Sequence, residues 1–222
     1  MVRHLLILNF DEISANLTYT MEKGTIFPLL YHPPIAYFMH LIRQSQSIKI
    51  ERFEHFPKQT YRNRTSIHSP NGKLDLIVPV NRGSKFHTPF KDVRISYEFN
   101  WQRLHLMSLQ TSYRSSAYFE FYEDELIPFY EKKWDFLFDY NEELFQFLLK
   151  SLKINIQYSF TEEYFKSYDQ ADFRTAIHPK QQSALDFRAY FQVFEERNGF
   201  LENLSILDLL FNQGPQSSNY LK

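Results

Sequence analysis

The sequence predicts an α/β protein with a mixed sheet, an N-terminal βαβ unit, a β-hairpin, flanking helices and a helix-rich C-terminal half. Two β-rich segments, residues 25–31 and 47–53, enclose a stretch in which apolar residues recur at helical spacing. An Asn-Gly pair at residues 71–72 separates two further β-rich runs. From Trp101 onward the apolar residues recur mainly at the spacing of helices. These three observations define the expected fold class.

The N-terminal unit begins with a strand that ends at the Pro33-Pro34 pair, because proline terminates strands and is favoured at the start of a helix. The helix that follows carries its apolar side chains on one face, at Ile35, Phe38, Met39 and Ile42. Residues 47–53 then alternate between polar and apolar side chains, as strands do. This order predicts two parallel strands joined by a right-handed crossover.

The hairpin prediction depends on Asn71-Gly72, which lies between residues 65–68 and 74–80. Tight hairpin turns need positive φ at their central residues, and Asn-Gly accepts it readily. Residues 93–97 are expected to form a further short strand.

Three longer helices are expected over residues 101–112, 118–131 and 139–152. Pro128 should limit or bend the second helix, and Asp139 or Asn141 can cap the third.

The end of the chain has a weaker pattern. Residues 154–159 are expected to return to the sheet, residues 161–185 to form loops, and residues 190–194 fit either a strand or a helix. The apolar run 204–211 ends before Gly214-Pro215, which is a helix stop.

Domain organisation is predicted to be simple, with a single domain over residues 21–222. Residues 1–20 differ in character and lead to a second methionine, Met21. One interpretation is that they are a non-native or poorly packed extension before a start at Met21. The alternative is a genuine N-terminal strand over residues 5–9.

Composition excludes several classes of protein. The 222 residues include no cysteine, so disulfides, thiolate zinc sites and cysteine nucleophiles are excluded. Residues 1–114 hold 15 Lys and Arg against 8 Asp and Glu, and residues 115–222 hold 10 against 18. This is not the basic face of a nucleic-acid-binding protein. The sequence lacks a run of 18 apolar residues and a signal peptide, so we expect a cytoplasmic protein.

Side chains that could bind a ligand are densest in residues 56–64, which combine Lys58, Arg62 and Arg64 with amides, a hydroxyl and two rings. Arginine holds phosphate or carboxylate through its planar fork, and Gln or Asn can orient a sugar or acyl group. If this segment is extended, its cations share one face. The alternative is a solvated strand, or an internal pair of an arginine with Glu51 or Glu54.

The sequence resembles the WbqC-like protein family over about residues 25–221. The matching motifs are PPIAYF at 33–38, KQTYRNR at 58–64, IVPV at 77–80 and WQ at 101–102 with His105 following. They continue with SYRSSAYFEFY at 112–122 and LSILDLLFNQGP at 204–215. Longer members carry a Gly-containing segment between residues 164 and 190 that this chain lacks, so no ligand contact is carried over there.

The resemblance implies a role in bacterial surface-polysaccharide (O-antigen, lipopolysaccharide) biosynthesis, with transfer of a glycyl or other acyl group onto an amino sugar. The alternative is a non-catalytic scaffold that holds sugars or another enzyme of the same pathway. The expected ligand is an anionic small molecule, such as a nucleotide sugar or an activated acyl donor. No cofactor is expected.

Catalytic and binding roles follow as hypotheses for residues in these motifs. His32 or His105 can act as a base because imidazole titrates near neutral pH, and Lys58 joins the cationic field. Each histidine can equally be a surface or core residue. The expected substrate contacts are Tyr37, Gln59, Tyr61, Arg62, Asn63, Arg64, Arg114 and Asn212.

Two of these candidates have structural alternatives. Arg114 either binds an anion or satisfies the last carbonyls of a helix. Asp208 lies within an apolar run and therefore needs a partner. It can pair with an arginine of the basic segment or act as a base in the site. The sequence has no phosphate-binding glycine loop, no G-x-S-x-G motif and no metal-ligand spacing.

Overall fold

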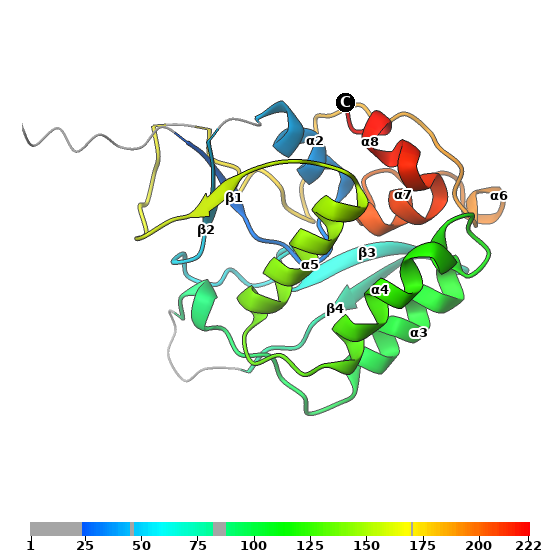
Figure 1. The fold of residues 1–222 in the computed structure, drawn as a ribbon, viewed down its shortest axis with the longest axis horizontal. Helices are drawn as coiled ribbons and strands as arrows, with labels where there is room; N and C mark the ends of the chain where they lie inside the picture. Colours follow the sequence, from blue (N-terminus) through cyan, green and yellow to red (C-terminus); the bar gives the residue numbers. More distant parts are fainter. Residues whose placement is uncertain (1–23, 45–46, 82–87, 170) are drawn as a thin grey trace, which may run out of the picture.

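A parallel sheet and an antiparallel hairpin form the framework of the molecule, and helices pack around both (Figure 1). The structure is a computed structural model that describes residues 24–44, 47–81, 88–169 and 171–222. Helices α3 and α4 lie at one end of the view and the parallel sheet at the other (Figure 1). This arrangement confirms the predicted α/β class.

The parallel sheet has the strand order β1-β2-β5. Strand β1 (Thr25–Pro28) pairs with β2 (Ile48–Glu51), and helix α2 (Ile35–Arg43) connects them, which confirms the βαβ unit. Strand β5 (Tyr158–Phe160) pairs in parallel with β2, so the chain returns to this sheet about where the sequence predicts. The carboxyl ends of all three strands therefore lie along one edge, where ligands commonly bind in open α/β sheets.

The hairpin consists of β3 (Arg64–Ser69) and β4 (Gly72–Ile77) in antiparallel register. Gly72 has a φ of +95°, which glycine adopts without steric cost. The predicted strand over residues 93–97 is not regular, since it contributes only single bridges from Arg94 and Ile95. The 3-10 helix η1 (Phe90–Asp92) precedes it.

Three long helices follow, close to their predicted positions. They are α3 (Trp101–Tyr113), α4 (Phe119–Glu131) and α5 (Leu137–Ser151). Pro128 lies inside α4 without ending it, because the helix runs three residues further. The predicted caps of α5 are wrong, since α5 begins after Phe136 without a side-chain cap and Asp139 lies in its first turn.

The C-terminal part contains α6 (Glu195–Asn198), α7 (Ile206–Gln213), η2 (Gly214–Gln216) and α8 (Ser217–Tyr220). Helix α7 is buried on nearly every side, which agrees with its apolar sequence, and it ends at Gly214 as predicted. Residues 190–194 are irregular, so neither of the two alternatives for them holds. Between β5 and α6 the described residues form loops.

The core is rich in rings that contact one another at their edges. Phe27, Tyr37, Phe38 and Phe145 form such a group above the parallel sheet, with Tyr37 edge-on to both Phe27 and Phe145. Edge contacts between rings add about 0.5–1.5 kcal/mol per pair beyond the burial of apolar area. In the described ranges, no helix is both long and apolar enough to cross a membrane. The two interpretations of residues 1–20 lie outside the described residues.

Candidate functional site: a buried histidine–tyrosine network

His32 follows strand β1 and has a strained backbone. Its φ is +40°, a value that non-glycine residues rarely adopt, and its side chain is fully buried. The carbonyl of His32 accepts hydrogen bonds from Thr65 Oγ1 at 2.7 Å and Ser205 Oγ at 3.3 Å. These contacts hold the strained conformation against its cost of about 1–3 kcal/mol. Strain of this kind is concentrated at functional sites.

The side chain of His32 ends a chain of four hydrogen-bonded groups. Its Nε2 lies 2.8 Å from the hydroxyl of Tyr130, which lies 3.2 Å from the hydroxyl of Tyr31. The Tyr31 hydroxyl lies 2.9 Å from Nδ1 of His105. The network therefore joins the turn after β1 to helices α3 and α4. It brings together the two histidines that the sequence offers as candidate bases.

Both imidazoles are neutral at pH 7. Burial, followed by the proximity of His105, lowers the pKa of His32 to about 3. Burial lowers the pKa of His105 to about 4, although the nearby backbone of Ile77 raises it in part. Neutral imidazole has one nitrogen that donates and one that accepts, so it can take up a proton and pass one on.

The position of the proton on His105 sets the direction of the hydrogen bonds along the chain. The Ile77 backbone favours protonated His105, so we place a proton on the nitrogen that faces it. Nδ1 of His105 then accepts from Tyr31, Tyr31 accepts from Tyr130, and Tyr130 accepts from Nε2–H of His32. Nδ1 of His32 is left as an acceptor, and it has no hydrogen-bond partner among the described residues. The network thus ends in a buried nitrogen that is unprotonated at pH 7 and has a free lone pair.

Two further polar atoms lie next to the network. Nε1 of Trp101 is buried without a hydrogen bond to any described group, and the buried Tyr140 hydroxyl forms no well-aligned hydrogen bond, although it lies close enough to Tyr31 and Tyr130 to influence the pKa of both hydroxyls. The Tyr140 ring lies 5.9 Å from that of Tyr31 and 5.8 Å from that of Trp101. Each unpartnered buried group costs about 1–3 kcal/mol, so a set of them beside one network indicates a place that a ligand or water satisfies.

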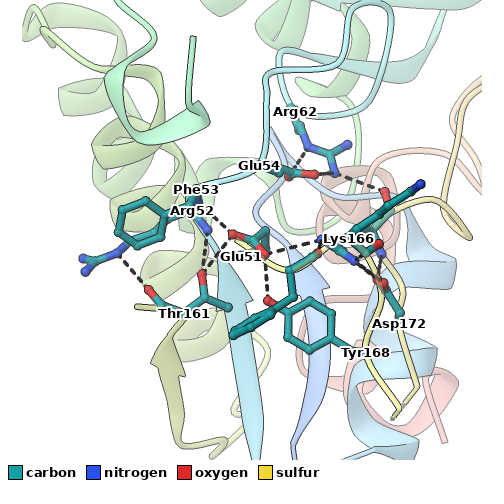
Figure 2. A network of polar contacts seen from close by, with 11 residues as sticks. Glu51, Arg52, Phe53, Glu54, Arg62, Thr161, Lys166, Tyr168 and Asp172 are labelled. Carbon is teal, nitrogen blue, oxygen red and sulfur yellow. Dashed lines mark hydrogen bonds and ion pairs between the residues drawn. The ribbon is translucent and has the colours of Figure 1, made fainter. Parts of the chain in front are cut away.

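The basic segment is not extended, so the condition for a shared cationic face is not met. Residues 58–63 form turns, and Gln59 has a φ of +59°. Arg62 is buried and donates to Glu54 through Nε at 2.6 Å and through an Nη atom at 2.8 Å (Figure 2). This is the internal pair that the sequence left open as the alternative to an anion contact. The role of Arg62 in ligand binding stays untested.

A second polar network lies at the carboxyl edge of the parallel sheet (Figure 2). Glu51, the last residue of β2, accepts hydrogen bonds from Thr161 at 3.0 Å and Tyr168 at 3.1 Å. Arg174 contacts Glu51 at 3.5 Å and Asp172 at 2.5 Å. Since Thr161 follows β5, this network ties the irregular segment 161–174 to the sheet. Arg174 is shared by the two carboxylates, and the remaining contacts of Glu51 are made within the protein, which indicates a structural role.

Among the described residues, no hydrogen bond joins the side chains of the rest of the basic segment to His32 or His105. Tyr61 is buried, and its carbonyl accepts a hydrogen bond from the backbone N–H of Tyr31 at 2.9 Å. Asn63 is buried and donates to the carbonyl of Val78 at 2.9 Å. Lys58 and Gln59 are exposed. Arg64 opens β3 and has a buried Nε without a partner.

Tyr37 is part of the core, since it is fully buried and donates to the Pro28 carbonyl at 3.0 Å. Arg114 caps α3 and forms an exposed ion pair with Glu123 at 2.7 Å. The predicted substrate contacts at these two positions stay predictions.

Asp208 lies in a separate network on α7, away from the basic segment. Its carboxylate accepts from Tyr113 at 2.8 Å, Tyr190 at 2.5 Å and Gln192 at 2.9 Å. The proposed pairing with an arginine is therefore replaced by bonds to neutral donors. Burial raises the pKa of Asp208, and the hydrogen bonds lower it in part. The side-chain amide of Asn212 donates to the backbone carbonyl of Asp208 at 2.8 Å, one turn earlier in α7.

The structure thus joins His32 to His105 in one network, while Arg62 and Asp208 form hydrogen bonds in other networks and Lys58 is exposed. Sequence reasoning missed the tyrosines that connect the histidines. Tyr31 stands next to His32, but nothing in the sequence distinguishes Tyr130 and Tyr140 from the other tyrosines. Among the described residues, no group of three or more His, Asp or Glu side chains could hold a metal ion.

Comparison with known proteins agrees with the fold and its motifs. The fold is an α/β domain whose polar networks lie at the carboxyl edge of a parallel sheet and in the turn after its first strand. The model of the WbqC-like protein family matches residues 30–184, and the chain belongs to this family. It is similar to the uncharacterized protein Rv1507c of Mycobacterium tuberculosis, with 27% identity over 91% of this chain and 98% of the relative. No solved structure matches significantly.

Proposed function

We propose that this protein is a transferase of bacterial surface-polysaccharide biosynthesis that moves a glycyl or other acyl group from an activated donor onto an amino sugar. The single observation that carries the proposal is the chain from His105 through Tyr31 and Tyr130 to His32, which ends in an unpartnered Nδ1. The family membership gives the pathway as the context of the proposal.

His32 acts as the general base in this proposal. The amine of the acceptor sugar attacks the carbonyl carbon of the donor, a C–N bond forms, and the amine proton moves to Nδ1 of His32. His32 then passes the proton at Nε2 along Tyr130 and Tyr31 to Nδ1 of His105, which becomes a transient imidazolium and returns the proton by the same path to the departing leaving group. The bond between the acyl carbon and the leaving group breaks, and the leaving group departs with the bonding electron pair. Neutral imidazole is the form that this step requires at pH 7.

Two buried groups suit the charge that develops during the attack. The carbonyl oxygen becomes an oxyanion, and it needs hydrogen-bond donors that are already in place. The Trp101 indole N–H is a buried donor without a partner among the described residues, and the Tyr140 hydroxyl is a buried donor that forms no well-aligned hydrogen bond with its neighbours Tyr31 and Tyr130. Because His32, Trp101 and Tyr140 are buried, the substrate reaches them only when covering side chains move.

The test is a ligand panel followed by a transfer assay on the full chain. Nucleotide sugars, nucleotides, coenzyme A, glycine and glycyl-adenylate analogues are screened by thermal shift, since a ligand at 100 times its Kd adds about 2.7 kcal/mol. Stabilising donors are then incubated with amino sugars and the amide product is measured. His32→Asn is the variant of choice because asparagine tolerates the positive φ at this position.

The expected result is amide formation by the wild type and a large loss in His32→Asn with donor binding retained. Tyr122→Phe is the matched control, because the Tyr122 hydroxyl forms no hydrogen bond within the described chain. Equal transfer by His32→Asn and the wild type would remove the proposed base. Absence of both binding and transfer across the panel would favour the scaffold instead.

A further inference from the structure

Lys180 and His178 lie beside the turn of residues 58–63, which Arg64 follows in the chain, and the charge of Arg64 acts on His178. Arg64 opens the hairpin strand β3, whereas His178 and Lys180 lie in the irregular segment after β5. Lys180 Nζ donates to Oε1 of Gln59 at 2.7 Å, so the two segments are joined directly. The backbone of Gln59, whose side chain accepts this hydrogen bond, has a positive φ of +59°. The strained turn therefore positions a lysine beside the basic segment.

The histidine of this group presents a donor. The backbone N–H of Lys180 donates to Nδ1 of His178 at 3.1 Å. Neutral His178 must then carry its proton on Nε2, which leaves this N–H available to a ligand. His178 is partly exposed and Lys180 is exposed, so solutes can reach both side chains.

The charges that act on His178 are positive. Burial, followed by the charges of Lys180, Arg62 and Arg64, lowers the pKa of His178. The charge of Arg62 is compensated by Glu54. Arg64 forms no ion pair with a described residue, and its buried Nε has no acceptor. A group of cations held together in this way is stabilised when an anion binds between them.

We propose that Arg64, His178 and Lys180 form a phosphate-binding subsite. Three donors on two segments suit a tetrahedral oxyanion, whereas a planar carboxylate needs only one arginine fork. The subsite borders the His105 end of the network, because Arg64 pairs with Ile77 across the hairpin and the Ile77 backbone lies beside His105. That this phosphate belongs to the activated donor rests on the proposed function.

Isothermal titration of the full chain with inorganic phosphate, pyrophosphate and a nucleoside diphosphate tests the subsite, at constant ionic strength with chloride as the reference anion. We expect the phosphate compounds to bind and chloride not to compete. Arg64→Gln should raise their Kd about tenfold, the usual effect of losing one charge-assisted hydrogen bond. Arg103→Gln is the matched control, since Arg103 is an exposed arginine on α3.

Lys180→Gln keeps the inference falsifiable if Arg64→Gln folds poorly, because Lys180 is exposed and its loss leaves no buried group unpaired. A second readout is the NMR titration of His178, whose pKa should rise when phosphate compensates the neighbouring cations. Unchanged Kd in Lys180→Gln and an unchanged pKa of His178 would overturn the subsite. Binding of the nucleoside diphosphate well above that of inorganic phosphate would identify a nucleotide as the source of the phosphate.

The two proposals fail in different ways. If phosphate binding depends on Arg64 and Lys180 but no acyl transfer is found, the subsite stands and the proposed transferase does not. If transfer depends on His32 while phosphate binding is the same in all variants, the reaction stands and the subsite does not.

Discussion

The hydroxyl of Tyr130 lies 2.8 Å from Nε2 of His32, although 98 residues separate the two in the chain. This contact fixes the imidazole of a residue with a positive φ and connects it to Tyr31 and, through Tyr31, to His105. The hydroxyl of Tyr130 is therefore the point at which the network can be broken with the smallest change in shape.

We expect Tyr130→Phe to lower the free energy of unfolding by about 1–3 kcal/mol, because it leaves Nε2 of His32 buried without a partner. It should also slow acyl transfer by about a hundredfold or more, the usual contribution of acid–base groups, with little effect on donor binding. Urea unfolding and single-turnover kinetics measure the two effects. Tyr122→Phe serves as the control for removal of a tyrosine hydroxyl. If both variants lost equal stability and activity, the relay would have no role.

Acid should destabilise the protein through its buried histidines. The pKa values of His32 and His105 fall to about 3 and 4 in the folded state, against about 6.5 in the unfolded chain. Between these values the unfolded state binds more protons, so stability is present above pH 6.5 and is lost as the pH falls towards 4. Each unit of difference is equivalent to about 1.4 kcal/mol, so the loss should reach a few kcal/mol.

Urea unfolding from pH 7.5 to pH 4 measures this loss, and His105→Asn should show a shallower dependence than the wild type. The raised pKa of Asp208 acts in the opposite direction, but both proteins share it and it cancels in the comparison. The same slope in both proteins would show that His105 is not the buried neutral group described above.

Much of the fold can be predicted from local patterns, because residues adjacent in the sequence set where helices, strands and turns begin and end. The Pro33-Pro34 pair, the Asn71-Gly72 turn and the Gly214-Pro215 stop all mark element boundaries that the structure confirms. The cap of α5 was predicted wrongly because the helix begins at the buried Leu137, two residues before Asp139. Residues 93–97 look like a strand, but their partners supply only isolated bridges.

The site was less predictable because its contacts join distant residues. His32 and His105 could be chosen by residue type, since neutral imidazole suits acid–base chemistry. Their connection depends on Tyr130, and no local pattern separates one tyrosine of a ring-rich core from another. Arg62 shows why the alternatives stayed open: its residue type suggests an anion contact, and the sequence also allows the pair with Glu54, eight residues away, that the folded chain forms.

Glycine at position 214 is required by both its backbone and its surroundings. Gly214 has a φ of +50°, and a Cβ there would lie 2.5 Å from the ring of Tyr118. We expect Gly214→Ala to cost about 2–5 kcal/mol, from overpacking together with left-handed strain. Gly199→Ala is the control, because its φ is +75° but no atom lies within 4 Å of the new Cβ. Thermal unfolding should show a clearly smaller loss in the control.

The buried pair of Arg62 and Glu54 should contribute to stability rather than to ligand affinity. Arg62→Ala leaves Glu54 buried without its cation, which typically costs about 3–5 kcal/mol. Burial already raises the pKa of Glu54 in the presence of Arg62, so the variant carboxyl escapes part of the cost by binding a proton. The loss of stability should therefore be larger at pH 8 than at pH 5. Urea unfolding at the two pH values measures it.

The exposed pair of Lys150 and Glu125 is the control for Arg62→Ala, since its atoms are 2.6 Å apart but both side chains are at least half exposed. Lys150→Ala should cost about 1 kcal/mol or less. Adding Glu54→Leu to Arg62→Ala should recover part of the lost stability, because it removes the unpaired carboxyl. At a temperature where Arg62→Ala is fully folded, it should retain phosphate binding at Arg64 and Lys180. Loss of that binding in the folded variant would instead make Arg62 a direct ligand contact.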